Sequence, residues 1–341
     1  TWKVAPALAA GNTVVLKPSE ETPLCAEELT KLIERAGFPP GVFQLLHGHG
    51  EKVGKALVAH PEVDAVIFTG SLEVGRKIKQ EVALSDKKFC TVETGSKSAV
   101  IVLKSAHMDN LAIPAAIASA FKTAGQRCVS ASRILVHRKR YDEFCGKFVR
   151  TARKLRVDNP VNPHSFYGPM INAAGVEKGK LFNRHARNEG FQILLDRNGE
   201  ESPTPDGHWL FPFVYTTDEW RSDSFVLKNE AFAPHLAIIP FANVEEAVRI
   251  YNDTRYGLSV AIITENYRTA RYVEENAEAG IFYWNLPCIG AGVRMPFGGV
   301  KASGNLIPSA AGILPAIAHY TAATYNRGTE IQMAQGLKIN I

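Results

Sequence analysis

The chain has 341 residues, of which 45% are hydrophobic and 21% are charged, and its formal net charge is +5. This composition is typical of a globular protein and excludes a low-complexity or fibrous chain. The densest basic run, residues 137–140, is too short for a nucleic-acid-binding stripe, and no apolar run approaches the about 20 residues that a membrane helix needs. We therefore expect neither a nucleic acid nor a membrane as a partner.

The first part of the chain alternates between strand and helix patterns. Short β-branched and apolar runs predict strands at 12–18, 41–48, 63–70 and 89–95, and helical spacing predicts helices at 25–37, 50–61 and 71–83. A repeated β-α-β order with apolar strands indicates an α/β fold with a parallel, doubly wound sheet. Such sheets bind ligands beyond the carboxyl ends of their strands.

The rest of the chain keeps an α/β pattern with different spacing. Strands are predicted at 97–103, 131–137 and 258–265, and helices at 111–128, 141–155, 243–257 and 267–280. Loops rich in Pro, Gly and Asn separate them at 158–172 and 197–209. The length and the change of pattern predict two domains, 1–95 and 96–307, followed by a C-terminal segment, 308–341.

The five cysteines are odd in number, widely spaced and without a C-x-x-C pair. They suggest neither a zinc site nor a disulfide framework, and they favour a reducing compartment such as the cytoplasm. Cys128 stands apart, because it lies in "AGQRCVSAS", among small and hydroxylated residues. These nine residues leave two interpretations open: a buried structural thiol or a catalytic nucleophile.

Three other places carry candidate chemistry. Gly70 and Ser71 open a predicted helix directly after a strand, where free N–H groups attract phosphate, although Ser71 could be an N-cap alone. Lys17 and Glu20 follow a strand and form either a ribose-binding pair or an exposed loop pair. Glu93 ends a predicted strand, and it could be either a general base or an ordinary surface carboxylate. No cluster of residues indicates a metal site.

Taken in order, these stretches resemble the aldehyde dehydrogenase superfamily. The resemblance covers nearly the whole chain and rests on "TWKVAPALAAGNTVVLKPSE", "FTGSLEVG", "VETGSKS", "AGQRC", "NEAFAP", "YWN" and "PFGGVKASG". It implies an aldehyde dehydrogenase-like fold, with part of an NAD-binding domain followed by an α/β catalytic domain. It also implies that 308–341 returns toward the body and takes part in oligomerisation, and that the full-length protein is a homo-oligomer.

The resemblance implies catalytic roles for two residues. Cys128 would attack a small-molecule aldehyde and carry the thioester that forms after hydride transfer, and Glu93 would activate the water that hydrolyses it. Members of the family that pass the acyl group to coenzyme A generally lack this glutamate. Glu93 therefore favours hydrolysis to the carboxylic acid over transfer to coenzyme A.

The resemblance also implies cofactor contacts. Glu230 would hold the nicotinamide ribose with Phe232 packed beside the ring, Lys17 and Glu20 would bind the adenosine ribose, and Gly70 and Ser71 would lie near the pyrophosphate. The carboxylate of Glu20 would repel a 2′-phosphate and so favours NAD over NADP. The sequence departs from the family's usual residues at Thr94, Ser96 and Ala233.

Two motifs and one arginine indicate the class of substrate. "NDTRYGLS" and "PFGGVKASGNLIPSA" are similar to the branch that oxidises succinylglutamate semialdehyde in arginine breakdown, which suggests a role in amino-acid catabolism. Arg294, in the loop before "PFGG", would pair with a substrate carboxylate or be a surface arginine. The aldehyde is therefore expected to carry a carboxylate.

The family's Pro-Trp-Asn motif, whose asparagine amide helps to form the oxyanion hole, lies just before the point where this sequence begins. We therefore expect an N-terminally incomplete member, whether a gene fragment, a truncated gene model or a degenerate paralogue. A targeting segment could precede it. The alternative functions left open are a catalytically impaired fragment and a nucleotide-binding pseudoenzyme.

Overall fold

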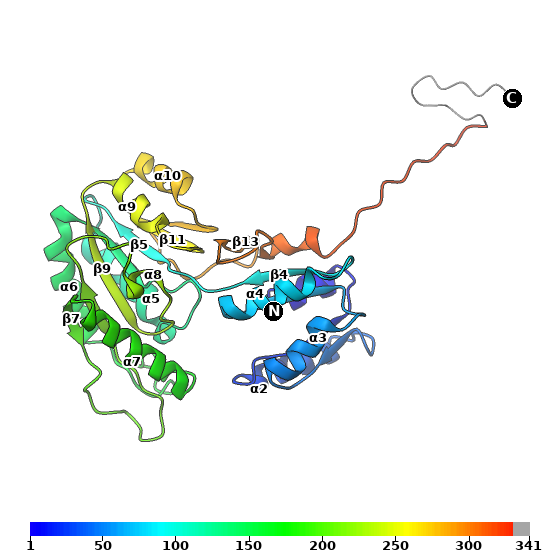
Figure 1. Ribbon diagram of the computed structural model, residues 1–341, viewed down its shortest axis with the longest axis horizontal. Helices are drawn as coiled ribbons and strands as arrows, with labels where there is room; N and C mark the ends of the chain where they lie inside the picture. The colour runs from blue at the N-terminus through cyan, green and yellow to red at the C-terminus, as the bar shows by residue number, and fades with distance from the viewer. Residues whose placement is uncertain (330–341) are drawn as a thin grey trace.

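A computed structural model describes residues 1–329, and residues 330–341 of the expected C-terminal segment lie outside that part. Figure 1 shows a larger α/β body, a smaller body built from the N-terminal part, and an extended C-terminal stretch that leaves both. The helices are α1 (Val4–Ala9), α2 (Pro23–Arg35), α3 (Lys55–Ala59), α4 (Leu72–Val82), α5 (Ile113–Phe121), α6 (Tyr141–Arg153), α7 (Ala173–Asn188), α8 (Phe225–Lys228), α9 (Val244–Asn252) and α10 (Tyr267–Asn276). The strands are β1 (Val14–Leu16), β2 (Phe43–Leu45), β3 (Ala65–Thr69), β4 (Phe89–Glu93), β5 (Ala99–Val102), β6 (Arg133–His137), β7 (Gln192–Asp196), β8 (Phe213–Thr216), β9 (His235–Phe241), β10 (Tyr256–Gly257), β11 (Ser259–Ile263), β12 (Ile281–Trp284), β13 (Pro296–Phe297), β14 (Val300–Lys301) and β15 (Ser309–Ala310).

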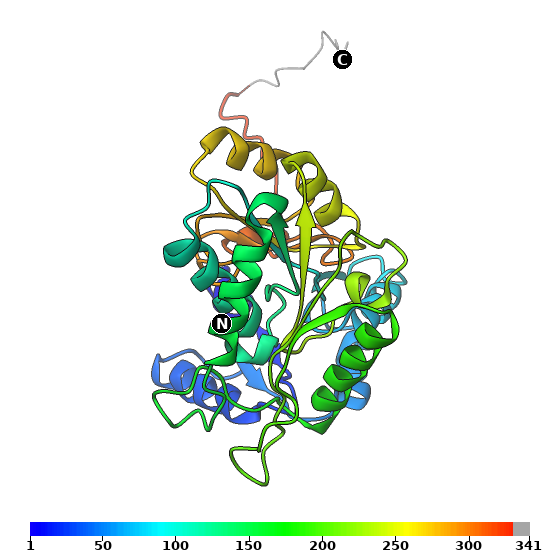
Figure 2. The same cartoon turned by 90° about the vertical axis from the view of Figure 1, so that its left-hand side faces the viewer.

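The larger body is built on a seven-stranded sheet of order β12-β11-β5-β6-β9-β8-β7. All neighbours pair in parallel except β7, which runs antiparallel to β8. Every residue of β5, β8, β9 and β11 is buried, as expected for strands covered on both faces. Figure 2 shows α5 and α6 on one face of this sheet and α7 on the other. The predicted α/β fold with a parallel sheet is confirmed.

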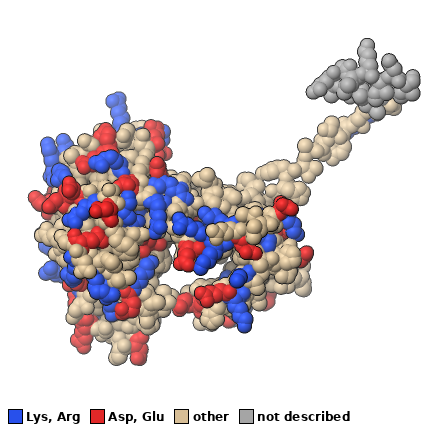
Figure 3. Space-filling model, in the orientation of Figure 1, with Lys and Arg blue, Asp and Glu red and all other residues tan. Residues whose placement is uncertain are grey.

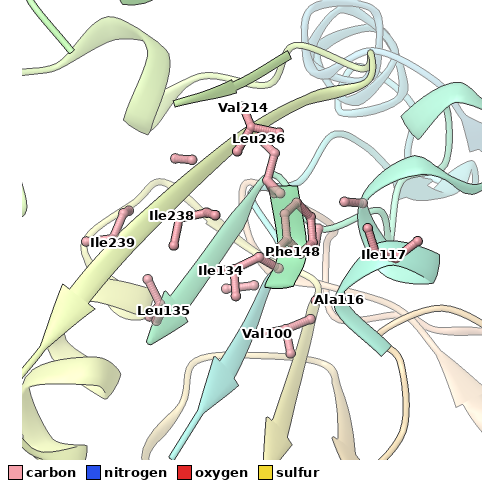
Figure 4. Close-up of a cluster of buried hydrophobic side chains, with 14 of the residues drawn as sticks. Val100, Ala116, Ile117, Ile134, Leu135, Phe148, Val214, Leu236, Ile238 and Ile239 are labelled. Atoms are coloured by element: carbon pink, nitrogen blue, oxygen red, sulfur yellow. The ribbon is translucent and has the colours of Figure 1, made fainter. Parts of the chain in front are cut away.

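The core of the larger body lies between this sheet and its helices. Figure 4 shows Phe148 of α6 and Ile117 of α5 directed at side chains of the central strands, among them Val100 and Ile134. All four side chains are at most 5% exposed. The segment that contains Cys128 directly precedes β6 of this sheet.

The smaller body has the strands that the sequence predicts, in two parallel pairs. β1 pairs with β2 and β3 pairs with β4. The predicted helix 50–61 is a π-helical turn, Gly50–Gly54, that continues into α3. In the second pair, Thr69 lies opposite Glu93, so two polar residues meet at the carboxyl ends of β3 and β4.

The predicted helix 111–128 is wrong at its C-terminal end, because α5 stops at Phe121. Thr123, Ala124 and Gly125 then adopt positive φ angles of 59°, 53° and 68°. A Cβ at Gly125 would lie 2.4 Å from the carbonyl oxygen of Ala233, so close packing against that backbone requires a glycine at this turn. Cys128 is therefore presented by a loop instead of a helix.

The segment around 296–310 connects the two bodies. Asn305 Nδ2 donates to the carbonyl of Cys90 at 2.7 Å, and its Oδ1 accepts from the Val92 N–H at 3.1 Å. β13 and β15 form an antiparallel pair, and the Ala310 N–H donates to the Trp2 carbonyl at 3.2 Å. This places residues from the beginning and the end of the described chain beside β4.

Candidate active site

Cys128 lies partly buried at the edge of an apolar cluster. Val129, Leu258, Phe297 and Ala310 form that cluster, and Trp2, Cys128, Ile281, Ile289 and Ala291 pack against it. Burial, and then the negative charges of Glu93 and Glu230, raise the pKa of the Cys128 thiol to about 11, although the N–H groups of Val129 and Cys128 oppose the shift. The thiol is therefore protonated at neutral pH, and its use as a nucleophile requires a group that removes the proton.

Glu93 is held at the buried end of β4 by two donors. Its Oε1 accepts a hydrogen bond from Ser309 Oγ and lies 3.6 Å from Lys3 Nζ. Its Oε2 accepts no hydrogen bond from residues 1–329, which leaves this oxygen for a water molecule. The carboxylate is thus fixed at one oxygen and open at the other, as a general base requires.

Lys3 joins Glu93 to the end of β3. Its Nζ donates to Thr69 Oγ1 at 2.6 Å and to the carbonyl of Phe68 at 3.0 Å. Burial lowers the pKa of Lys3, while the charge of Glu93, its hydrogen bond and the nearby Cys128 act in the opposite direction. Lys3 is therefore a partly buried side chain that joins Glu93 to the carboxyl end of β3, near Cys128.

Sequence reasoning missed Lys3 and Ser309. No local pattern marks Lys3 as a functional lysine. Ser309 lies in "PSA", a stretch that indicated only which branch of the family the chain resembles. The contact between Ser309 and Glu93 joins residues 216 positions apart. Only the tertiary structure brings these residues together.

Glu230 lies against the turn that follows β4. Its Oε1 accepts the Ser96 N–H at 2.8 Å, and a Cβ at Gly95 would lie 2.3 Å from its Oε2. Burial raises the pKa of Glu230, and the Ser96 N–H and the positive charges of Lys178, Lys97 and Arg255 lower it. The turn after Glu93 therefore fixes a second carboxylate near the thiol.

Phe232 follows Glu230 on the same segment. It has a positive φ of 55° and a side chain that is 40% exposed. The left-handed region is disfavoured for bulky residues, so the surrounding structure must hold this residue in place. The ring is a candidate surface for a flat ligand.

Lys17 and Glu20 lie just after β1 in the smaller body. Lys17 Nζ donates to the carbonyls of Gly48, at 2.9 Å, and Pro18, and it lies 3.4 Å from Glu20 Oε2. Hydrogen bonding to its own backbone N–H, and then to Lys17, lowers the pKa of Glu20. An open cleft of about 290 Å³ is lined there by Pro18, Ser19, Glu20, Pro23, Glu27, His47, Gly48 and His49.

The other predicted residues are more dispersed. Ser71 Oγ accepts the Val74 N–H and caps α4, and a Cβ at Gly70 would lie 2.4 Å from the Phe68 ring. Arg294 is exposed and forms no salt bridge with any residue in the described part of the chain. Its loop nevertheless adjoins the thiol, since Ile289 and Ala291 pack on the cluster beside Cys128.

Figure 3 shows an opening between the two bodies, with charged side chains of both signs along its border. Within residues 1–329, no helix has the length and hydropathy to cross a membrane, and no group of three or more His, Cys, Asp or Glu could hold a metal ion.

The chain matches known proteins over most of its length. The model of the aldehyde dehydrogenase family matches residues 1–324. A 2-aminomuconic semialdehyde dehydrogenase of Bos taurus is 37% identical over 308 residues, which are 89% of this chain and 62% of the relative. An aldehyde dehydrogenase of Emericella nidulans is 40% identical over 306 residues, 89% of this chain and 60% of the relative. The chain thus spans about 60% of the length of these curated relatives.

Solved structures of dehydrogenases also superpose on this chain. A betaine aldehyde dehydrogenase from Staphylococcus aureus in complex with NAD+ superposes with a TM-score of 0.88 at 30% identity, over 93% of this chain and 63% of that one. A glyceraldehyde-3-phosphate dehydrogenase from Methanocaldococcus jannaschii, complexed with NADP, superposes with a TM-score of 0.84 at 35% identity, over 93% of this chain and 67% of that one.

Proposed function

The chain belongs to the aldehyde dehydrogenase family, and on this premise we propose that the protein oxidises an aldehyde to a carboxylic acid through a thioester on Cys128. The observation that carries the proposal is the carboxylate of Glu93, which Ser309 and Lys3 hold at Oε1 while Cys128 packs against the apolar cluster that contains Ala310, the neighbour of Ser309. Ser309 contacts only Oε1 of Glu93, which leaves Oε2 for a water molecule. Glu230 packs directly against Gly95, where a side chain would clash with its carboxylate.

The chain's residues also fit NAD. The Glu230 carboxylate beside Gly95 suits the diol of one ribose, and Glu20, at the open cleft of the smaller body, suits the other. The exposed ring of Phe232 suits the flat nicotinamide. The charge of Glu20 would repel a 2′-phosphate, which favours NAD over NADP.

The reaction then follows from the groups at the site. The Cys128 thiol loses its proton to water, and the sulfur forms a bond to the carbonyl carbon of the aldehyde, whose oxygen takes up the negative charge. NAD held by Glu230, Phe232 and Glu20 would supply the acceptor for the hydride of this carbon, and loss of that hydride would leave a thioester on Cys128. Glu93 next removes a proton from a water that attacks the thioester carbon, and the C–S bond breaks to release the acid. Lys3 and Ser309 hold Glu93 Oε1 throughout.

We propose a semialdehyde that carries a carboxylate as the substrate class. Arg294 supports this, because it is exposed, lacks an acidic partner among the described residues and belongs to a loop that packs beside Cys128. The name of the Bos taurus relative points to the same class for that protein. A semialdehyde substrate would also suit a role in amino-acid catabolism.

We further propose that the protein is a homo-oligomer in the cytoplasm. Figure 1 shows the stretch before residue 329 leaving the body, and it carries Tyr320 and Tyr325 at 81% and 80% exposure. A second copy that covers these rings would make a homo-oligomer, which light scattering on the purified protein tests. Five free cysteines favour the cytoplasm.

The proposed function is tested with the purified chain, NAD and a panel of aldehydes with and without a carboxylate, followed as NADH formation. We expect NADH to form only with both NAD and an aldehyde, and Arg294→Ala to raise the KM for carboxylate-bearing aldehydes alone. Binding of NAD without oxidation of any aldehyde would favour a nucleotide-binding pseudoenzyme instead.

A further inference from the structure

We propose that Ser309 is a positioning residue that holds Glu93 Oε1 and offsets its charge beside Cys128, so that Oε2 alone serves the reaction. Ser309 is 1% exposed, and its hydroxyl donates to Glu93 Oε1. The inference rests on the proposed role of Glu93.

The backbone around Ser309 directs the hydroxyl at this carboxylate. Ser309 pairs with Phe297 across β13 and β15, and the next residue, Ala310, has φ 58° and ψ −135°. This is a conformation that alanine rarely adopts, and such strain persists only where surrounding contacts impose it. Here the Ala310 N–H is bound to the Trp2 carbonyl at 3.2 Å.

The same bond ties Ser309 to the second group that holds Glu93. Lys3 follows Trp2 directly, and its Nζ lies 3.6 Å from the oxygen that Ser309 contacts. Trp2 is fixed in turn by an edge-on contact with Phe297, whose ring centroid is 5.0 Å away. The hydroxyl and the ammonium therefore reach Glu93 Oε1 from two backbone segments that are bonded to each other.

Two consequences follow for the chemistry. With Oε1 occupied, only Oε2 can take a proton from a thiol or a water. In addition, a donor on Oε1 withdraws negative charge from a carboxylate that disfavours the thiolate of Cys128. Loss of the Ser309 hydroxyl should therefore make Cys128 less reactive, and it should do so only while Glu93 is charged.

Iodoacetamide labelling of Cys128 tests this without NAD or aldehyde, so its result does not depend on dehydrogenase activity. A Cys25→Ser background removes the one exposed cysteine among residues 1–329, and peptide mass spectrometry follows Cys128. Ser309→Thr and Ser309→Val have nearly the same shape and differ in the hydroxyl, so any disturbance of packing is common to both. Ser224→Ala is a matched control, because Ser224 is another buried serine that donates to a glutamate, Glu189.

At pH 8 we expect Ser309→Val to slow labelling about threefold relative to Ser309→Thr, which corresponds to about half a unit of thiol pKa. Ser224→Ala should stay within about twofold of the parent, since it lies outside the site. In a Glu93→Gln background the difference between the Ser309→Thr and Ser309→Val variants should vanish. Equal rates for the two Ser309 variants, or an equal difference when Glu93 is absent, would overturn the proposal.

The kinetics of NADH formation distinguish a failure of this inference from a failure of the proposed function. If the parent forms NADH, Ser309→Val should keep the initial burst and slow the phase that follows it, and Ser309→Thr should restore that phase. If the parent forms no NADH with any aldehyde, the proposed function fails, and the labelling result still decides whether Ser309 acts on Glu93.

Discussion

Gly95 leaves no room for a side chain beside Glu230, because a Cβ at Gly95 would lie 2.3 Å from the Glu230 Oε2 atom. The same turn presents the Ser96 N–H to Glu230 Oε1 at 2.8 Å. The turn after the proposed base, Glu93, therefore also positions the carboxylate proposed to bind a ribose, and changes in this turn should affect cofactor binding more than the thiol.

Gly95→Ala should weaken NAD binding by about tenfold to a hundredfold, since displacing Glu230 loses its hydrogen bond to the ribose, and a hydrogen bond to a charged group is worth about 1.5–3 kcal/mol. Calorimetric titration with NAD measures the change. Gly199→Ala is the control, because a Cβ at Gly199 meets no atom within 4 Å. Unchanged affinity in Gly95→Ala would remove Glu230 from the cofactor site.

Glu93→Gln should change two rates in opposite directions. Labelling of Cys128 should accelerate by up to about tenfold, because the charge of Glu93 raises the pKa of this thiol. Turnover after the NADH burst should fall about a hundredfold or more, as expected when a general base is lost. Stopped-flow absorbance follows the second rate, and slower labelling combined with unchanged turnover would contradict the assignment.

The labelling rate of Cys128 should depend steeply on pH. A thiol whose pKa is raised to about 11 is almost fully protonated at pH 7. As long as the pH is below the pKa, each increase of one pH unit raises the thiolate fraction about tenfold. The rate should therefore rise with unit slope between about pH 7 and pH 10 in the protein without cofactor. A plateau reached below pH 8 would mean that the site stabilises the thiolate.

Arg133 should be the main determinant of stability beneath the site. Its fully buried guanidinium donates to the carbonyls of Lys97, Ile250 and Tyr251, so Arg133→Met leaves buried acceptors without donors. We expect the free energy of unfolding to fall by about 3 kcal/mol or more. Denaturant titration measures it, with exposed Arg271→Met as a control that should cause little change. Equal effects of the two variants would contradict this account.

The strands of the smaller body, and β5, β6 and β11 of the larger sheet, follow from pattern alone, whereas β7, β8, β9 and β12 were not predicted. The apolar, β-branched runs at 63–70 and 89–95 predict two strands, and the structure pairs them in parallel with Thr69 opposite Glu93. Cys128 and Glu93 could be proposed as functional residues because both lie in recognisable motifs. Their chemistry requires particular residue types in particular contexts, which a sequence displays directly.

The remainder depends on tertiary contacts. Thr123 and Ala124 are compatible with a helix, and only the packing of Gly125 on the Ala233 carbonyl shows why the chain turns there. Helix α7 was not predicted, because Gly175 and Gly179 weaken its pattern, although Gly179 allows close contact with Leu210. Lys3 and Ser309 reach Glu93 through pairings between distant segments, which no local pattern encodes.

In the proposed reaction, Cys128 carries the substrate as a thioester, and a water activated by Glu93 hydrolyses it. The most direct test mixes the Glu93→Gln chain with NAD and an aldehyde, quenches it in acid within the burst, and locates the bound acyl group by peptide mass spectrometry. The account predicts about one acyl group per NADH formed, all of it on the peptide that contains Cys128. NADH formation without this adduct, or an adduct on Cys25, Cys145 or another cysteine in its place, would contradict it.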